Sequence, residues 1–147
     1  MHATSPSNQA NAPYLGSIYV ANISNREGQY LRNQLLDKLA GDIRNKGSYE
    51  YELRAHQLKE QIIHLGVRRD ATSTRAQMRS EVSVQLVDLA TDKIVLQRTL
   101  HATNSFNILN SQFSTQVTEQ DSRERTLDDL ARQIITQITL FRQRGGQ

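Results

Sequence analysis

Two arginines lie where they could bind an anionic ligand, on the most regular stretch of the sequence, DATSTRAQMRSEVSVQLVD (Asp70 to Asp88). In this stretch small or apolar residues alternate with polar ones, and a period of two indicates a β-strand. Arg75 and Arg79 fall on its polar face, about 13 Å apart at ~3.3 Å per residue. A guanidinium group can donate two parallel hydrogen bonds to a phosphate or a carboxylate, so this face is suited to an anion.

The same arginines have a plainer interpretation as part of a solvated strand face. One exposed, charged face is usual in antiparallel sheets. On such a face Arg75 and Arg79 would pair with Glu81 or Asp88, and each exposed pair would contribute less than about 1 kcal/mol to stability. The sequence leaves both interpretations open.

The residues needed for catalysis or metal binding are missing or dispersed. The chain has no cysteine, which excludes disulfides, thiolate metal sites and thiol nucleophiles. Its four histidines are His2, His56, His64 and His101, and they lack the spacing of metal ligands. No glycine-rich phosphate loop and no arrangement of Ser, His and Asp stands out. We therefore expect no metal, no cofactor and no enzymatic activity.

The length and composition predict one domain with a mostly aliphatic core. The chain has 147 residues, of which 37% are hydrophobic, with three Phe, five Tyr and no Trp, and this length suits a single core. We expect a flexible leader over residues 1–15, rich in Ser, Asn and Pro, and one domain over residues 16–144. The net charge of +3 is mild beside the dense basic patch of a nucleic-acid-binding protein. No stretch reaches the ~18 apolar residues of a membrane-spanning helix.

Hydrophobic periodicity predicts the elements that position the arginines. The expected strands cover Gly16 to Ile23, the segment from Tyr49 with a bulge near Gln57, Thr72 to Asp88, and Lys93 to Ala102. The expected helices cover about Gln29 to Lys46, and Asp121 to about Phe141 after a capping box at Thr118 and Asp121. The polar segment Thr103 to Gln120 is interpreted as a long ordered loop. The cluster Arg26, Gly28, Gln29, Arg32 and Asn33 is interpreted as helix capping rather than as an anion site.

These elements predict an α+β fold in the order β-α-β-β-β-α, with two helices packed on one face of a four-stranded mixed sheet. The opposite face is polar and free to meet a ligand or partner. The first half of the long strand, Thr72 to Met78, carries fewer apolar residues than the second half. We expect this half to extend past the helices as a hairpin with Gln61 to Val67, ending in a basic tip.

Three clusters carry a family resemblance by their order and separation. They are REGQYLRNQLLDKL (Arg26 to Leu39), DATSTRAQMRSEVSVQLVD, and SFNILNSQFSTQVTEQDSRERTLDDLARQI (Ser105 to Ile134). Over roughly Gly16 to Arg142 the chain resembles the lipopolysaccharide-assembly lipoprotein family LptE, particularly its alphaproteobacterial form. The resemblance implies two helices on a four-stranded sheet, which agrees with the fold expected from periodicity.

The resemblance also implies a function and a set of partners. Members of the family are non-enzymatic, are anchored by an N-terminal lipid on the periplasmic side of the outer membrane, plug the β-barrel protein LptD and help it assemble, and bind lipopolysaccharide. The lipidated cysteine that opens a mature member is missing here, and we expect that Met1 replaces it in a soluble form of the protein. Nucleic acid is not an expected partner.

On this basis the cationic residues become candidates for lipopolysaccharide binding: Arg75, Arg79, Arg98, Arg68, Arg69 and Lys93. The polar, aromatic segment supplies candidates for the partner interface: Phe106, Asn107, Asn110 and Phe113. An aromatic residue in a loop is more often a local core anchor than an interface residue, so the two phenylalanines have both interpretations. Two alternative functions remain: a sheet platform that binds nucleic acid, and a periplasmic adaptor that lends a sheet edge to another protein.

Overall fold

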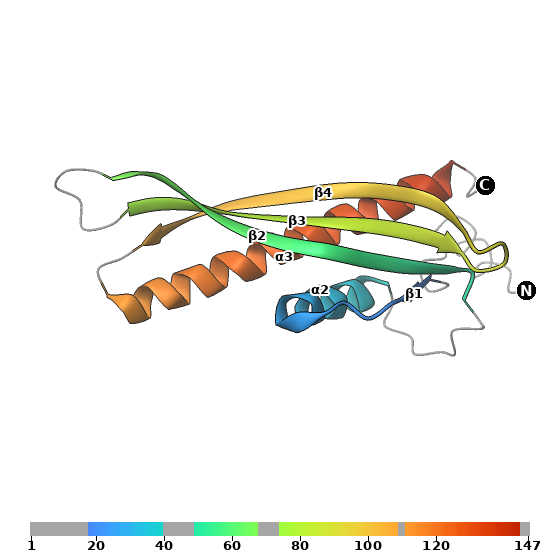
Figure 1. The fold of residues 1–147 in the computed structure, drawn as a ribbon, viewed down its shortest axis with the longest axis horizontal. Coiled ribbons are helices and arrows are strands. Elements are labelled where there is room, and N and C mark those ends of the chain that lie inside the picture. Colours follow the sequence, from blue (N-terminus) through green and yellow to red (C-terminus); the bar gives the residue numbers. More distant parts are fainter. Residues whose placement is uncertain (1–17, 40–48, 68–73, 109–110, 145–147) are drawn as a thin grey trace, which may run out of the picture.

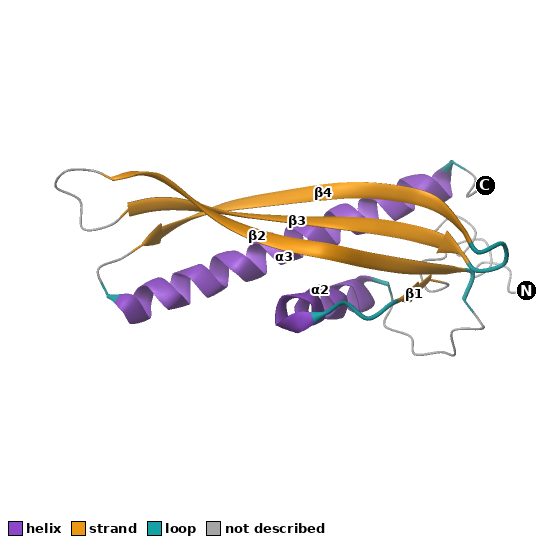
Figure 2. Ribbon diagram, viewed as in Figure 1, coloured by secondary structure: helices purple, strands orange, loops and turns teal. Residues whose placement is uncertain are grey.

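The computed structural model describes residues 18–39, 49–67, 74–108 and 111–144. Its elements, in chain order, are β1 (Ile18–Val20), α2 (Asn25–Lys38), β2 (Tyr51–Val67), β3 (Thr74–Asp88), β4 (Lys93–Ile108) and α3 (Gln112–Gln143). The strands form one sheet in the order β1-β2-β3-β4, with β1 parallel to β2 and the other pairs antiparallel. Both helices lie on the same side of the sheet (Figures 1 and 2). The predicted α+β fold is confirmed.

Side-chain hydrogen bonds hold the start of α2. The Asn25 side-chain oxygen accepts a hydrogen bond from the Gly28 backbone N–H at 2.9 Å, and Gln29 donates to the Ile23 carbonyl at 2.7 Å. Arg32 donates to the Val20 carbonyl at 3.2 Å, which ties the helix to β1. The cap therefore comes from Asn25, which lies outside the predicted cluster, whereas the cluster members Gln29 and Arg32 donate to carbonyls of the preceding segment. The helix begins four residues before the predicted Gln29, and Asn25 satisfies one of its first free amides, that of Gly28. The predicted residues 40–46 lie outside the described residues.

Replacing Gly28 with alanine is expected to lower the free energy of unfolding by about 2 kcal/mol, the cost of overpacking a filled site. A Cβ atom at this position would lie 2.6 Å from Cγ2 of Ile23 and 2.9 Å from its carbonyl carbon and oxygen. Urea unfolding followed by circular dichroism measures the change. Asn33→Ala on the exposed side of the same helix is the control and should be neutral or slightly stabilising. A Gly28→Ala protein as stable as the wild type would contradict the close packing.

The main core lies between the helices and the half of the sheet nearest β1, here called the proximal half. Leu31 and Leu35 from α2 and Leu130, Ile134 and Ile138 from α3 are at most 1% exposed. They pack in one cluster with strand residues that include Leu53, Val82, Val84 and Leu86. Tyr30 of α2 donates a hydrogen bond to Asp128 of α3 at 3.0 Å, which joins the two helices at the edge of this core.

The Tyr30 hydroxyl is expected to make stability depend on pH at the alkaline end. Burial and, next, the hydrogen bond to Asp128 raise the pKa of Tyr30 from 10.0 to about 12. Because the folded-state pKa is the higher one, the stabilisation is complete below pH 10 and is lost as the pH rises through 12. The difference in unfolding free energy between wild type and Tyr30→Phe should therefore shrink over this range. An Asp128→Asn protein that keeps the full pH dependence would contradict this assignment.

The second strand changes face at a β-bulge. Gln57 has a φ of 55°, and the register with β3 shifts between His56 and Lys59, so the predicted bulge is confirmed. Before the bulge Leu53 and Ala55 face the helices, and after it Glu60 and Ile62 take that face. A bulge increases local twist, so the far half of β2 turns relative to the near half.

The far half of the sheet, here called the distal half, consists of residues 59–67, 74–81 and 101–108. Here the predicted loop over Thr103 to Gln120 is wrong, because β4 pairs with β3 as far as Ile108, opposite Thr74. Leu100, Ala102 and Phe106 are buried on alternate positions, so the strand period continues through the polar residues. Residues 112–120 of the predicted loop belong to α3.

Helix α3 begins nine residues before the predicted Asp121. Ser111 is its N-cap and accepts from the Ser114 N–H at 3.4 Å. The predicted capping box at Thr118 is wrong because Thr118 lies inside the helix, where its hydroxyl donates to the Ser114 carbonyl. Hydrophobic periodicity did not predict the first turns of α3. In these turns Thr118, Ser122 and Thr126 occupy the sheet-facing positions, which aliphatic residues occupy later in the helix.

The long strand has a helix of matching length beneath it. The 32 residues of α3 span about 48 Å at ~1.5 Å per residue, and the 15 residues of β3 span about 50 Å. The predicted hairpin of β2 and β3 exists and extends past α2, but α3 runs alongside it (Figure 1). Ala76 and Met78 are fully buried in a second cluster with Phe106, so the distal half is a covered layer and not a free ribbon.

Candidate functional site

The candidate site is the side of the sheet that faces away from the helices. Its distal part, here called the distal outer face, carries the side chains of Gln61, Ile63, Arg75, Gln77, Arg79, Thr103, Ser105 and Asn107. These residues alternate with the buried residues of the same strands. In cross-strand register Arg75 lies opposite Asn107, and Arg79 lies opposite Gln61 and Thr103. Each arginine is therefore flanked by uncharged polar side chains.

The two arginines of this face are exposed and carry its charge. Glu81 lies at the border of the face and pairs with His101 at 3.0 Å, and Asp88 accepts from the Ala90 N–H at 2.9 Å. Among the described residues no carboxylate forms an ion pair with Arg75 or Arg79. The distal outer face therefore has positive charge that is available to a ligand.

Of the four cationic candidates that lie in the described residues, the structure brings together Arg75 and Arg79. Arg98 lies opposite Val84, a core residue, so its side chain is on the helix side of the sheet, where it donates to the Gln97 carbonyl at 2.7 Å. Lys93 lies opposite Asp88, about 43 Å along β3 from Arg75 at ~3.3 Å per residue. Arg68 and Arg69 lie outside the described residues. The support expected from Arg98 and Lys93 is therefore not found in the geometry.

The four candidates for the partner interface do not lie together on one surface as far as the structure describes them. Asn107 is exposed beside Arg75 and belongs to the distal outer face. Phe106 is 6% exposed in the second core cluster, so it is a core anchor and is not available to a partner. Phe113 is 74% exposed on the first turn of α3 and has Val117, 52% exposed, one turn later. Asn110 lies outside the described residues.

Sequence reasoning missed Gln61, Thr103 and Ser105 as members of this face. The signal for the two β4 residues was present in the alternation of Leu100, Ala102 and Phe106, whose neighbours must point to the other side. Gln61 could be placed only by knowing the register after the bulge in β2. A shallow depression of about 310 Å³ adjoins the face and is lined by Lys59, Glu60, Gln61, Arg79 and Glu81. The depression places Lys59 near Arg79, together with the carboxylates of Glu60 and Glu81.

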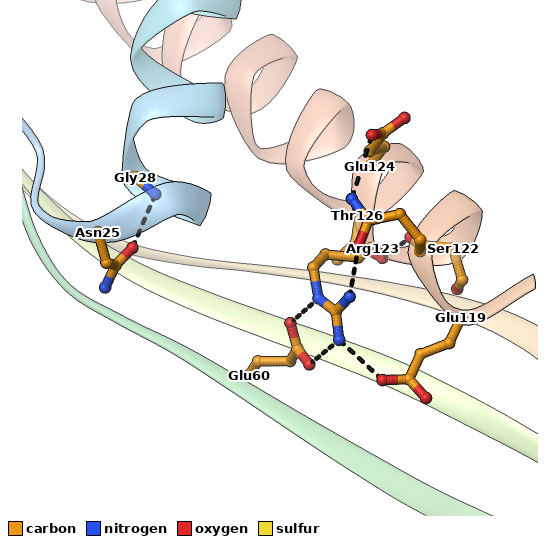
Figure 3. A network of polar contacts seen from close by, with 9 residues as sticks. Asn25, Gly28, Glu60, Glu119, Ser122, Arg123, Glu124 and Thr126 are labelled. Atoms are coloured by element: carbon orange, nitrogen blue, oxygen red, sulfur yellow. Dashed lines mark hydrogen bonds and ion pairs between the residues drawn. The ribbon is translucent and has the colours of Figure 1, made fainter. Parts of the chain in front are cut away.

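An ion-pair network on the helix side holds the distal hairpin to α3 (Figure 3). Arg123 of α3 donates to both carboxylate oxygens of Glu60 on β2, at 2.6 and 2.8 Å, and to Glu119 at 2.9 Å. The hydrogen bond to Glu60 is the main cause that raises the pKa of the Arg123 guanidinium. Arg123 is only 16% exposed. The network thus fixes the strand that carries Gln61 at one end of the distal outer face.

The described residues, 18–39, 49–67, 74–108 and 111–144, also bear on metal binding and on membrane crossing. Within them no group of three or more His, Cys, Asp or Glu residues is placed to hold a metal ion. Neither described helix is long and apolar enough to cross a membrane.

Comparison with known proteins agrees with the fold. A profile of the family described as LptE, lipopolysaccharide-assembly, matches residues 15–139. A minor lipoprotein from Acinetobacter baumannii is 25% identical with a TM-score of 0.66, covering 85% of this chain and 93% of that one. A candidate lipoprotein from Caulobacter crescentus CB15 is 21% identical with a TM-score of 0.67, covering 87% and 92%.

A more distant structure shares the same architecture. The rare lipoprotein B from Shewanella oneidensis is 11% identical with a TM-score of 0.59, covering 88% of this chain and 98% of that one. No curated protein matches the chain. Since the family profile spans most of the sequence, from the residues before β1 into the last turns of α3, the chain belongs to the LptE family of lipopolysaccharide-assembly proteins.

Proposed function

We propose that this protein works without catalysis in lipopolysaccharide assembly, as a plug that helps the outer-membrane barrel LptD to assemble and that binds lipopolysaccharide itself. Membership of the LptE family supports the general role, and the lipoproteins of the same fold support attachment through an N-terminal lipid. The proposed location is the periplasmic side of the outer membrane. The observation that carries the binding role is the pair of arginines on the distal outer face, Arg75 and Arg79, which form no ion pair with a carboxylate of the described residues.

The chemistry of lipopolysaccharide fits this face. Its phosphates and carboxylates are the groups that a guanidinium binds through two hydrogen bonds. Arg75 and Arg79 lie about 13 Å apart along one strand, so they would contact separate anionic groups of one ligand or of two neighbouring ones. Asn107, Gln77 and Thr103 lie around them and would bind sugar hydroxyls or further phosphate oxygens.

The same face suits a polar lumen. The interior of an outer-membrane barrel is polar, so a plug needs short hydrogen-bonding side chains instead of an apolar surface. Thr103, Ser105 and Asn107 supply these along the outer face of β4. Phe113 and Val117 at the start of α3 supply a small apolar contact at the same end of the molecule.

Co-expression with the cognate barrel protein tests the plug. We expect the two proteins to co-purify in a stoichiometric complex that survives high salt, because a plug is held by a large surface and not by a few exposed ion pairs. Pull-down from detergent extracts followed by sizing of the complex measures this. Purification of the barrel protein alone would contradict the proposal.

Nucleic-acid binding is the competing function, and the outer face argues against it. Sheet-platform RNA-binding proteins stack bases on exposed aromatic side chains of the central strands. The outer-facing residues described for β2, β3 and β4 include no Phe, Tyr or Trp. Tight, salt-sensitive binding of single-stranded RNA without a barrel complex would favour the competitor.

A further inference from the structure

The two long edges of the sheet are protected unequally. On β4 the register directs the backbone groups of the odd-numbered residues away from β3. Two of these carbonyls are occupied by α3: Gln133 donates to the His101 carbonyl at 2.7 Å, and Thr118 donates to the Asn107 carbonyl at 3.2 Å. Side chains that cover a sheet edge block the addition of another strand. The β4 edge is therefore partly closed by its own helix.

As far as the described residues show, the β2 edge is protected only near its start. The three residues of β1 pair with Tyr51 to Leu53, and the Ala21 N–H donates to the Leu53 carbonyl. After the bulge the register with β3 directs the backbone groups of Glu60, Ile62 and His64 outward. Among the described residues none bonds to these backbone groups.

This open stretch also has the composition of a pairing strand. Its sequence from Gln61 to Leu65 is QIIHL, which contains no proline or glycine. Leu65 is 48% exposed, and Ile63 is half-buried on the outer face. An unpaired edge with apolar side chains is a template for a further strand.

We propose that the distal edge of β2 binds the same edge of a second copy of this chain, antiparallel and centred on Ile62. In this register Glu60 of each copy lies opposite His64 of the other. The Glu60 carboxylate keeps acceptor positions beyond its two bonds from Arg123, so the imidazole N–H can donate to it. A parallel arrangement in register would place Glu60 beside Glu60. The segment is thus self-complementary under a two-fold axis, as an isologous interface requires.

The remaining pairs of this register are compatible with each other. On the outer face Gln61 lies opposite Ile63, and the Lys59 side chain lies beside Leu65, which it can cover with its methylene groups. The pairing extends the two sheets into one and leaves Arg75 and Arg79 exposed. The interface therefore goes beyond the proposed function, and neither one requires the other.

Sedimentation equilibrium of the whole chain from micromolar to millimolar concentration tests the proposal. We expect a reversible monomer–dimer equilibrium. His64→Glu places two carboxylates opposite each other at two symmetric positions, and like charges in direct cross-strand pairs are unfavourable, so the association constant should fall about tenfold or more. Thr99→Glu adds the same charge on the exposed outer side of β4 and should leave it unchanged.

A distance measurement separates this interface from other dimers. The chain has no cysteine, so Lys59→Cys gives a single site for a spin label. Pairing centred on Ile62 places the two Cα atoms of residue 59 about 20 Å apart, three residues either side of the axis at ~3.3 Å each. A dimer that lacks a distance near this value would overturn the proposal.

Three further outcomes would also overturn it. The first is a protein that stays monomeric at every concentration. The second is an equal effect of His64→Glu and Thr99→Glu on the association constant. The third is a monomeric protein of which the His64→Glu variant, and not the Thr99→Glu variant, fails to co-purify with the barrel protein. The last result would assign the edge to a strand of the barrel protein. Lipopolysaccharide binding by the wild type would survive each of them, so failure here is distinguishable from failure of the proposed function.

Discussion

The double substitution Arg75→Glu and Arg79→Glu is expected to weaken lipopolysaccharide binding about 100-fold while leaving thermal stability nearly unchanged. A hydrogen bond to a charged group contributes about 1.5–3 kcal/mol, so losing two arginine contacts removes roughly 3 kcal/mol, which corresponds to about two decades in the dissociation constant. Stability should hold because both side chains are exposed and form no ion pair with a described carboxylate. Titration of fluorescent lipopolysaccharide at low salt, with thermal melts in parallel, measures both effects.

The matched control reverses two cations that lie elsewhere. Lys93→Glu with Arg98→Glu changes the net charge by the same amount, and both residues are exposed. One lies at the far end of the sheet and the other on its helix side, so binding should fall by much less than for the first pair. Equal losses in the two double variants would mean that lipopolysaccharide responds to total charge only, and the distal outer face would then not be the site.

Much of the fold could be predicted because the proximal core obeys simple periods. The aliphatic positions of α3 from Leu127 to Ile138 are buried at the helical spacing visible in the sequence. The strict alternation of β3 gave both its length and its faces. The break in alternation at Gln57 located a bulge whose φ of 55° the structure records.

Hydrophobic periodicity did not predict the distal half because several of its buried residues are small and polar. Ser122 and Thr126 are fully buried on α3, and Ser80 is 2% exposed on β3. The hydroxyl of Thr126 donates to the Ser122 carbonyl at 2.7 Å and accepts from Asn104 at 3.4 Å. Thr126 thus satisfies its hydrogen bonds locally, whereas the buried Ser122 hydroxyl has no hydrogen-bond partner among the described residues. Both residues line the helix–sheet interface without producing a hydrophobic period.

Part of the candidate site could be predicted from the sequence, namely the residues whose placement depends on one strand alone. Arg75 and Arg79 share a face by spacing alone, which needs only the period of one strand. Placing Arg98 needs the register between two strands, and a shift of one residue moves a side chain to the opposite face. With Arg98 opposite Val84, the register excludes it from the site that its charge suggested. Contacts between separate elements, such as Arg123 with Glu60, have no local signature at all.

The Arg123→Met substitution is expected to lower the free energy of unfolding by about 2 kcal/mol. Removing one partner of a fully buried ion pair costs about 3–5 kcal/mol, and the cost is smaller here because Glu60 and Glu119 are 29% and 33% exposed. The loss would concentrate in the distal half, where Glu60 and Glu119 would lie near each other without a cation. Urea unfolding gives the total, and hydrogen exchange of the β2 amides after the bulge gives its location.

Two further variants test whether the lower stability of Arg123→Met comes from the loss of the Arg123 ion-pair network or from the loss of a positive charge in general. Arg125→Met removes a nearby arginine whose pair with Asp121 is 55% and 63% exposed, and it should cost no more than about 0.5 kcal/mol. Adding Glu60→Met to Arg123→Met removes the uncompensated carboxylate as well, so part of the lost stability should return. If Arg125→Met is as damaging as Arg123→Met, or if the added Glu60→Met lowers stability further, the clamp between α3 and the distal hairpin does not hold the structure. Recovery in the double variant would instead mean that the stability lost in Arg123→Met comes from the Glu60 carboxylate left without its cation, and that the distal hairpin requires this charge to be compensated.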